Sequence, residues 1–315
     1  MAKPKKNSRE NEQKVLDWLV ESKALYITLI AFFVLYLLTR SILFPPLIAI
    51  NILALFAAET IQGVQKEGVK HELVELATAV LVALVLWYGS SFILGTPAPL
   101  DAIVSCSMLP SLERGDMVLL QGAHGVKAPV VNLTRGEWQS IDWSDYSVIC
   151  AGCQRPDGSI EPCLMEYDPL TGEYSSEANQ SGKLLRFECG SCSRFNHQTG
   201  VEEHVPCTKG ITISGTRIGE DLSNDVLVYT PQPGDTFKTE IIHRVYAVAN
   251  VDGENYYFTK GDNNPAFDVQ FGTKPSPQEN TVGKVLFRLP YLGYVKLFLW
   301  GFYADPAGCE YVYQH

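Results

Sequence analysis

An alcohol, an imidazole and two carboxylates of the kinds that acyl transfer needs lie in three short segments of this chain. Ser107 belongs to "SCSMLP", His243 to "EIIHRVYAV", and Asp262 and Asp268 to "FTKGDNNPAFD". A serine hydroxyl is a weak nucleophile at neutral pH unless a base takes its proton, and that base needs a third group to fix its tautomer. The residue types therefore fit a serine hydrolase.

Each of these residues also has a purely structural interpretation. Ser107 could be a turn residue shortly before a proline, and His243 could be a buried residue of an apolar strand. Asp262 stands in Gly-Asp-Asn-Asn-Pro, a composition that is typical of turns. The chemical interpretation therefore requires the three segments to meet in space.

Taken together, the segments resemble the signal peptidase I family, in particular its archaeal and endoplasmic-reticulum branch, which uses Ser, His and Asp. That branch carries a Ser-x-Ser-Met-x-Pro box, then Arg-Gly-Asp, His-Arg-Val and Lys-Gly-Asp-Asn-Asn. Here these boxes are 105–110, 114–116, 243–245 and 260–264, in the same order. The resemblance extends over 76–122 and 224–298 and implies a mainly β catalytic domain next to a membrane anchor.

The resemblance also implies a role for each matching residue. Ser107 is the expected nucleophile, and His243 stands where the bacterial branch has a lysine base. Asp268 is favoured as the residue that orients the histidine, with Asp262 in a supporting role, although the sequence leaves open which one touches the imidazole. The backbone N–H of Ser107 and the hydroxyl of Ser105 would form the oxyanion hole. A histidine base predicts activity that rises with pH through about 6.5.

The first box also suggests how substrate is bound. Met108 and Pro110 are expected to belong to the substrate-binding region with Ser105, and shallow apolar pockets would accept small side chains. Cys106 departs from the family, which usually has glycine there, so its side chain must point away from the substrate. The implied activity is removal of signal peptides after small residues.

Three apolar runs precede these boxes, at 24–39, 41–58 and 76–94. A bilayer core needs about 20 mostly apolar residues in a helix, so these runs predict three membrane spans. The head before them and the loop between the second and third runs both contain lysines. By the positive-inside rule the N-terminus is cytoplasmic and everything after Pro97 is extracytoplasmic.

After Pro97, short apolar runs are broken by Gly, Pro, Asp and Asn, which is typical of short antiparallel strands. The apolar stretch 290–303 is short for a span and is expected to pack on the domain or lie at the membrane interface, with a fourth crossing left open. The predicted organisation is a basic cytoplasmic head (1–23), three transmembrane helices (24–96), a signal-peptidase-like β domain (97–122 and 224–303), a cysteine-rich insertion (123–223) and a tail (304–315).

Two Cys-x-x-C pairs mark the insertion, Cys150 with Cys153 and Cys189 with Cys192. Four thiolates can hold one tetrahedral zinc, so a structural zinc of the ribbon type is the first interpretation. Disulfides are the rival, because the insertion is expected to face an oxidising exterior. Cys163 and Cys207 could pair in either case, and a redox Cys-x-x-C is less favoured because neither motif opens a βαβ unit.

The net charge of −10 argues against nucleic-acid binding, which relies on basic side chains. The function expected from these features is that of a multi-pass cell-membrane endopeptidase that needs no cofactor for catalysis. Its partners would be signal-peptide-bearing precursors, the lipid bilayer and the protein-export machinery. Two alternatives stay open: a catalytically silent relative that binds or assembles through its insertion, and a self-cleaving regulator of the same β fold, although such regulators use a lysine base.

Overall fold

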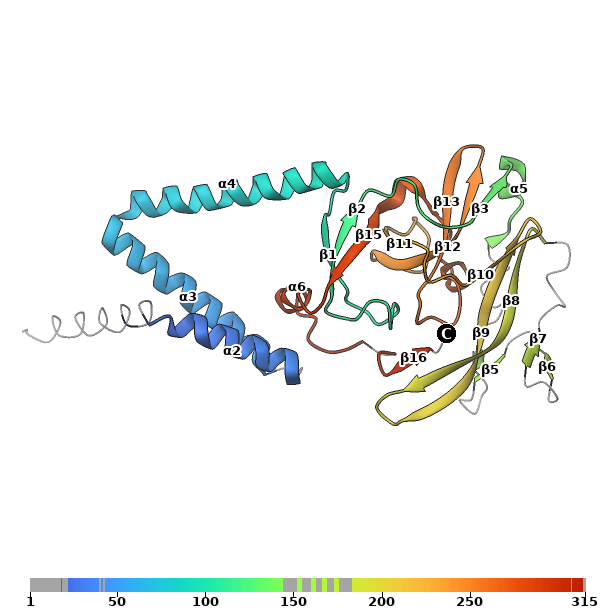
Figure 1. The fold of residues 1–315 in the computed structure, drawn as a ribbon, viewed down its shortest axis with the longest axis horizontal. Helices are drawn as coiled ribbons and strands as arrows, with labels where there is room; N and C mark the ends of the chain where they lie inside the picture. Colours follow the sequence, from blue (N-terminus) through green and yellow to red (C-terminus); the bar gives the residue numbers. More distant parts are fainter. Residues whose placement is uncertain are drawn as a thin grey trace, which may run out of the picture. The chain divides into compact units, whose positions relative to one another are not determined.

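A computed structural model describes residues 18, 22–39, 41, 43–143, 152–154, 160–162, 166–168, 173–175, 183–306 and 308–313 (Figure 1). These residues belong to two compact units. One contains residues up to Ser90 together with Phe298–Ala304 and is mainly helical. The other contains Ser91–Leu297 and the residues from Asp305 onward, and is mainly β. The predicted combination of apolar N-terminal helices with a β domain is therefore confirmed.

The helical unit contains α2 (Ala24–Thr39), α3 (Phe44–Glu67) and most of α4 (Val69–Leu94). Helices α2 and α3 pack together, with Asn51 Nδ2 donating to Thr28 Oγ1 at 2.7 Å and Tyr26 hydrogen-bonded to Glu59. By length and composition, Pro46–Glu67 and Val69–Leu94 are apolar enough to cross a membrane, whereas Ala24–Thr39 is a shorter apolar helix. Within the part of the chain that the structure describes, there are thus two candidate spans where the sequence predicted three.

The predicted loop between the second and third apolar runs is mostly helical. Helix α3 continues to Glu67 and α4 begins at Val69, so only Gly68 interrupts the helical backbone. Gly68 has φ +88°, a conformation that glycine adopts without the steric cost that a Cβ would add. The loop prediction was wrong because its charged residues were taken as a break, although they are good helix formers.

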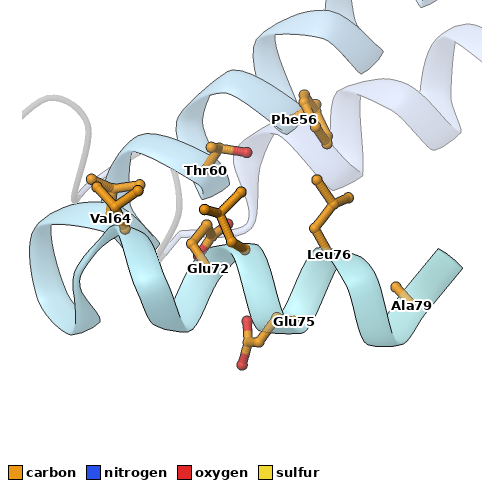
Figure 2. A pocket seen from close by; sticks show the side chains of 9 residues that line it. Phe56, Thr60, Val64, Glu72, Glu75, Leu76 and Ala79 are labelled. Carbon is orange, nitrogen blue, oxygen red and sulfur yellow. The ribbon is translucent and has the colours of Figure 1, made fainter. Parts of the chain in front are cut away.

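A groove of about 410 Å³ lies between α3 and α4 (Figure 2). Phe56, Thr60 and Val64 line it from α3, and Glu72 and Leu76 line it from α4. Helix α4 has no buried residue along its length. Exposure of so many apolar side chains is not stable in water, which agrees with a membrane environment for this helix.

The β unit is built on one large sheet with strand order β1-β2-β15-β11-β12-β13-β14, in which β3 also pairs with β12. The pairings are antiparallel except for β3 with β12, which is parallel. The strands are β1 (Leu100–Ala102), β2 (Met117–Gln121), β3 (Val130–Leu133), β11 (Val226–Tyr229), β12 (Ile241–Val251), β13 (Glu254–Lys260), β14 (Ser276–Pro277) and β15 (Thr281–Leu289).

A second sheet has the order β10-β9-β8-β16. It is dominated by the long hairpin of β8 (Leu185–Asn196) and β9 (Val201–Ile213), flanked by β10 (Thr216–Gly219) and β16 (Tyr311–Tyr313). Two small strand pairs complete the β structure, β4 (Gly152–Gln154) with β5 (Ile160–Pro162) and β6 (Glu166–Asp168) with β7 (Glu173–Ser175). The short helices are α5 (Arg135–Gln139), η2 (Asp268–Phe271), η3 (Gln278–Asn280) and α6 (Tyr294–Leu299).

The two large sheets share one hydrophobic core. Leu185, Phe187 and Ile211 of the second sheet are buried in the same cluster as Tyr246 and Phe258 of the first. Burial of such large side chains contributes about 1.5–3 kcal/mol each, so the two sheets support one another. Strands β8 and β9 of the 123–223 region therefore pack against the first sheet. In the 290–303 segment, Tyr294 and Leu297 are also buried.

The cysteines pair differently from the zinc prediction. Cys192 forms a disulfide with Cys207, with the two Cα atoms 5.7 Å apart, and Cys189 is also disulfide-bonded. Neither Cys189 nor Cys192 can then act as a zinc thiolate, and the suggested pairing of Cys207 with Cys163 is replaced. The β8–β9 register is the physical reason, because it brings Cys192 and Cys207 from facing strands within disulfide distance.

Several predicted cysteine positions lie outside the described residues. These are Cys150, Cys163 and the side chain of Cys153, whose backbone belongs to β4. A further disulfide, which the sequence analysis did not anticipate, joins Cys106 to Cys309. This disulfide joins the residue directly before Ser107 to one that lies 203 positions further along the chain.

Candidate active site

Ser107, His243 and Asp268 lie in hydrogen-bond contact in the β unit. The Oγ of Ser107 is 3.0 Å from Nε2 of His243. The Nδ1 of the same imidazole is 2.8 Å and 2.7 Å from the two carboxylate oxygens of Asp268. This is the arrangement of nucleophile, base and orienting acid that acyl transfer requires. Asp268, and not Asp262, lies against the histidine.

The β12–β13 hairpin positions the imidazole of His243. His243 is near the start of β12, and Arg244 beside it pairs with Lys260 at the end of β13. This register places the turn that begins at Gly261 next to the imidazole. A Cβ at Gly261 would lie 2.5 Å from the Ser107 carbonyl oxygen and 2.9 Å from His243 Nε2. Glycine is needed here because the chain approaches Ser107 and His243 too closely for a side chain.

Asp268 is held by donors in addition to the histidine. The hydroxyls of Tyr229 and Thr259 donate to its Oδ2 at 2.8 Å and 2.6 Å. The carboxyl group is only 2% exposed, and a buried carboxylate needs several hydrogen bonds to offset its lost hydration. Burial, and secondarily the Asp268 charge, raise the pKa of Tyr229 well above its ordinary value, so this phenol remains a donor.

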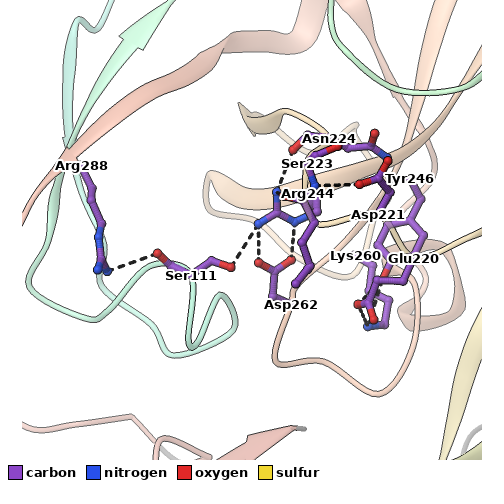
Figure 3. Close-up of polar contacts among 11 residues, drawn as sticks. Ser111, Glu220, Asp221, Ser223, Asn224, Arg244, Tyr246, Lys260, Asp262 and Arg288 are labelled. Carbon is purple, nitrogen blue, oxygen red and sulfur yellow. Dashed lines mark hydrogen bonds and ion pairs between the residues drawn. The ribbon is translucent and has the colours of Figure 1, made fainter. Parts of the chain in front are cut away.

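Asp262 has a different partner. It accepts hydrogen bonds from Nε and Nη2 of Arg244 at 2.8 Å and 2.6 Å (Figure 3). The same guanidinium donates to the carbonyl oxygens of Leu222 and Asn224, and to the Oγ of Ser111 at 3.2 Å. Because Ser111 follows the nucleophile in the same loop, Arg244 joins that loop to the sheet. Asp262 therefore supports the site indirectly, through Arg244.

Lys260 is buried, and its ammonium group lies near Glu220 and Tyr246. Its Nζ lies 4.0 Å from a carboxylate oxygen of Glu220 and 3.5 Å from the hydroxyl of Tyr246 (Figure 3). Burial lowers the pKa of Lys260, with Glu220 opposing that effect. In the bacterial branch a lysine is the expected base, but here the group against Ser107 is an imidazole.

A cleft of about 330 Å³ opens beside Ser107 and His243. The polar members of its remaining lining are Asp101, Ser105, Thr239, Glu240 and Asn264. The apolar members are Ala102, Val104, Val228, Phe237, Ile241 and Ile242. Both apolar and polar groups, two of them carboxylates, therefore line the cleft.

The remaining residues predicted from the first box are divided between the cleft and the core. Ser105 lines the cleft, and its Oγ is 3.2 Å from Ser107 Oγ. Met108 is fully buried in a core cluster with Ile103 and Leu112, away from the cleft lining. Pro110 is exposed and also absent from that lining. Met108 faces the core because the loop needs an apolar anchor between β1 and β2.

The sequence analysis did not assign roles to Tyr229 or Thr259. Both are polar residues buried in strands, and such residues need a hydrogen-bond partner. Thr259 directly precedes the Lys-Gly-Asp-Asn-Asn box, so its position was a usable signal. Tyr229 could not be found in this way, because it ends an apolar strand that belongs to none of the boxes.

Among the described residues, one group has atoms that could hold a metal ion. Ligand atoms of Glu67, His71 and Glu75 lie within 4.8 Å of one another. All three side chains are exposed, and the Nδ1 of His71 lies 2.6 Å from a carboxylate oxygen of Glu67 and 3.7 Å from one of Glu75. This arrangement needs no metal to explain it.

No protein-family model matches the chain. The chain is similar to the signal peptidase complex catalytic subunit SEC11 of Schizophyllum commune (strain H4-8 / FGSC 9210), with 28% identity over 80 residues. The match covers 24% of this chain and 42% of the length of that relative. It supports a distant, signal-peptidase-like relationship.

Proposed function

We propose that this protein is a membrane-bound serine endopeptidase that removes signal peptides from exported precursor proteins. The observation that carries the proposal is the contact of Ser107 with His243, and of His243 with Asp268. The similarity to SEC11 supports the same class of reaction. The apolar helices support a membrane-bound enzyme.

In the proposed reaction, Ser107 Oγ attacks the scissile carbonyl carbon while His243 Nε2 accepts the hydroxyl proton. The carbonyl oxygen becomes an oxyanion, which the backbone N–H of Ser107 and the hydroxyl of Ser105 stabilise. His243 then gives its proton to the leaving amine, and an acyl-enzyme forms on Ser107. A water molecule, deprotonated by His243, hydrolyses this ester and restores the serine.

Asp268 stabilises the imidazolium that forms during each proton transfer. It remains ionised throughout and keeps Nδ1 protonated, so Nε2 is free to accept the serine proton. Tyr229 and Thr259 hold its carboxylate in place. Every step uses side chains or backbone groups of this chain together with water, and the mechanism assigns no role to a cofactor.

The expected substrate segment has small side chains before the cleaved bond. Ala102, Val228 and Ile242 belong to the apolar part of the lining of the cleft that contains Ser107. A large side chain there would have to displace packed groups, at about 1–3 kcal/mol or more. The precursor's apolar helix would lie in the bilayer beside the enzyme, whose N-terminus is cytoplasmic and whose β unit is extracytoplasmic in this proposal.

Labelling with a fluorophosphonate probe tests the proposal. Wild type reconstituted in membranes should react at Ser107 and cleave a secretory precursor, whereas Ser107→Ala and His243→Ala should do neither. Ser140→Ala and His124→Ala are matched controls, since both side chains are exposed, and should behave as wild type. The catalytically silent alternative predicts no reaction of the wild type with probe or precursor, and that result would refute the proposed activity.

A further inference from the structure

The residue before the nucleophile is covalently joined to a distant segment. Cys106 forms a disulfide with Cys309, which lies shortly before β16 in the sequence. We call residues 308–313 the arm. The link fixes the position of the nucleophile loop through its immediate neighbour, at the place where the family resemblance leads one to expect a glycine.

Asn263 makes a second connection at the same place. Its Nδ2 donates to the carbonyl oxygen of Cys106 at 3.0 Å and to that of Tyr311 at 2.8 Å. Its Oδ1 accepts from the backbone N–H of Tyr313 at 2.8 Å, and its own N–H donates to the Ser107 carbonyl at 2.7 Å. One buried amide therefore joins the nucleophile loop to the arm.

The arm is itself held by the second sheet. Strand β16 pairs with β8, the N–H of His197 donates to the Glu310 carbonyl at 3.0 Å, and the Arg194 guanidinium lies 4.2 Å from the centre of the Tyr311 ring. His243 comes from β12 of the first sheet and Asp268 from η2, and the two sheets share a core. The nucleophile loop is thus tied to both sheets.

We propose that the arm is a positioning element of the active site, which holds the Ser107 loop so that Oγ stays within reach of His243. The proposal rests on the peptidase function and adds a requirement for residues 308–313. None of them touches the reacting atoms. Displacement of a reacting group by about 1 Å can cost on the order of 100-fold in rate, so a loop tether has a measurable effect.

The first test removes the link in the full-length protein in membranes. Cys106→Ala combined with Cys309→Ala should lower kcat for precursor cleavage about 10- to 100-fold. KM should change less than about twofold and the midpoint of the pH profile should be retained, because the cleft and the base are intact. The matched control combines Cys192→Ala with Cys207→Ala, which removes a disulfide of the β8–β9 hairpin and should retain kcat.

Asn263→Asp tests the hydrogen-bonded connection separately. It keeps an acceptor for Tyr313 but loses both donors to the carbonyl oxygens. It should lower kcat as well, and by a smaller factor when the disulfide is already absent, because both changes release the same loop. Additive losses would contradict a shared role.

Reduction of the folded wild type covers the case in which the cysteine variant does not fold. Dithiothreitol transfers two electrons and two protons to the disulfide, giving the Cys106 and Cys309 thiols, and is itself oxidised to a cyclic disulfide. The reduced enzyme should lose kcat and regain it on reoxidation, also when Cys192 and Cys207 are alanine. If the wild type is active and both the reduced enzyme and the double variant keep its kcat, the arm is not a positioning element and the peptidase function stands. A wild type that never reacts refutes both.

Discussion

Two neighbouring residues of β12, His243 and Arg244, each pair with a different buried aspartate. The two pairs differ in the groups that surround them, and therefore in the role we expect for each. His243 lies against Asp268 and faces the serine at the cleft. Arg244 lies against Asp262 and faces carbonyl oxygens and Ser111. Successive side chains of a strand point to opposite faces, so two adjacent residues can take part in two separate ion pairs. Of the two pairs, only the His243–Asp268 pair is a candidate for catalysis, because its histidine contacts the Ser107 hydroxyl.

The sharpest test of this comparison replaces Asp268 by asparagine. The side chain keeps its size but loses the charge that stabilises the imidazolium and the acceptor pair that fixes the tautomer. We expect kcat to fall on the order of 10⁴-fold while the protein remains folded. Single-turnover cleavage and a thermal melt measure the two quantities. A variant that retains most of its activity would remove Asp268 from the site.

Asp262→Asn should reduce folding stability more than it reduces kcat. It leaves the Arg244 guanidinium buried without a countercharge, which typically costs about 3–5 kcal/mol of folding free energy. We expect a lower melting temperature, with a kcat per folded molecule much closer to wild type than that of Asp268→Asn. Denaturant unfolding combined with active-site titration separates these effects. If Asp262→Asn instead lost catalysis at unchanged stability, the division of roles would be wrong.

Gly261→Ala tests the close approach of the turn to the reacting residues. The added methyl would meet the Ser107 carbonyl and His243 Nε2, so the serine and the base must move apart. We expect kcat to fall on the order of 100-fold. Gly136→Ala is the control, because a Cβ there meets nothing within 4 Å and its φ is not positive. Equal activity of the two variants would show that the site tolerates the displacement.

Tyr229→Phe should give the smallest effect of the four. It removes one of the hydrogen bonds to Asp268, and a bond to a charged group contributes about 1.5–3 kcal/mol, of which only a part concerns the transition state. We expect kcat to fall about tenfold, with KM unchanged. Tyr291→Phe, at an exposed tyrosine, is the control. An unchanged kcat would assign Tyr229 to packing alone.

The apolar helices and the mainly β character after Pro97 followed from hydrophobic patterning, because burial and periodicity are local properties of a sequence. The helical structure on both sides of Gly68 was missed because hydropathy alone does not distinguish a charged helical segment from a loop. Met108 was placed in the cleft by its box, whereas packing placed it in the core. A motif gives residue types in order, but not the direction in which each side chain points.

The sequence by itself determined which functional groups are present. These are a serine, a histidine and two aspartates, in the order found in the family, and they follow the apolar helices in the chain. Only the tertiary structure decided that Asp268 and not Asp262 meets His243, that Cys192 pairs with Cys207, and that Cys106 is joined to Cys309. These outcomes depend on strand register and on contacts between residues far apart in sequence. Register is set by the packing of the whole sheet, so no local pattern contains it.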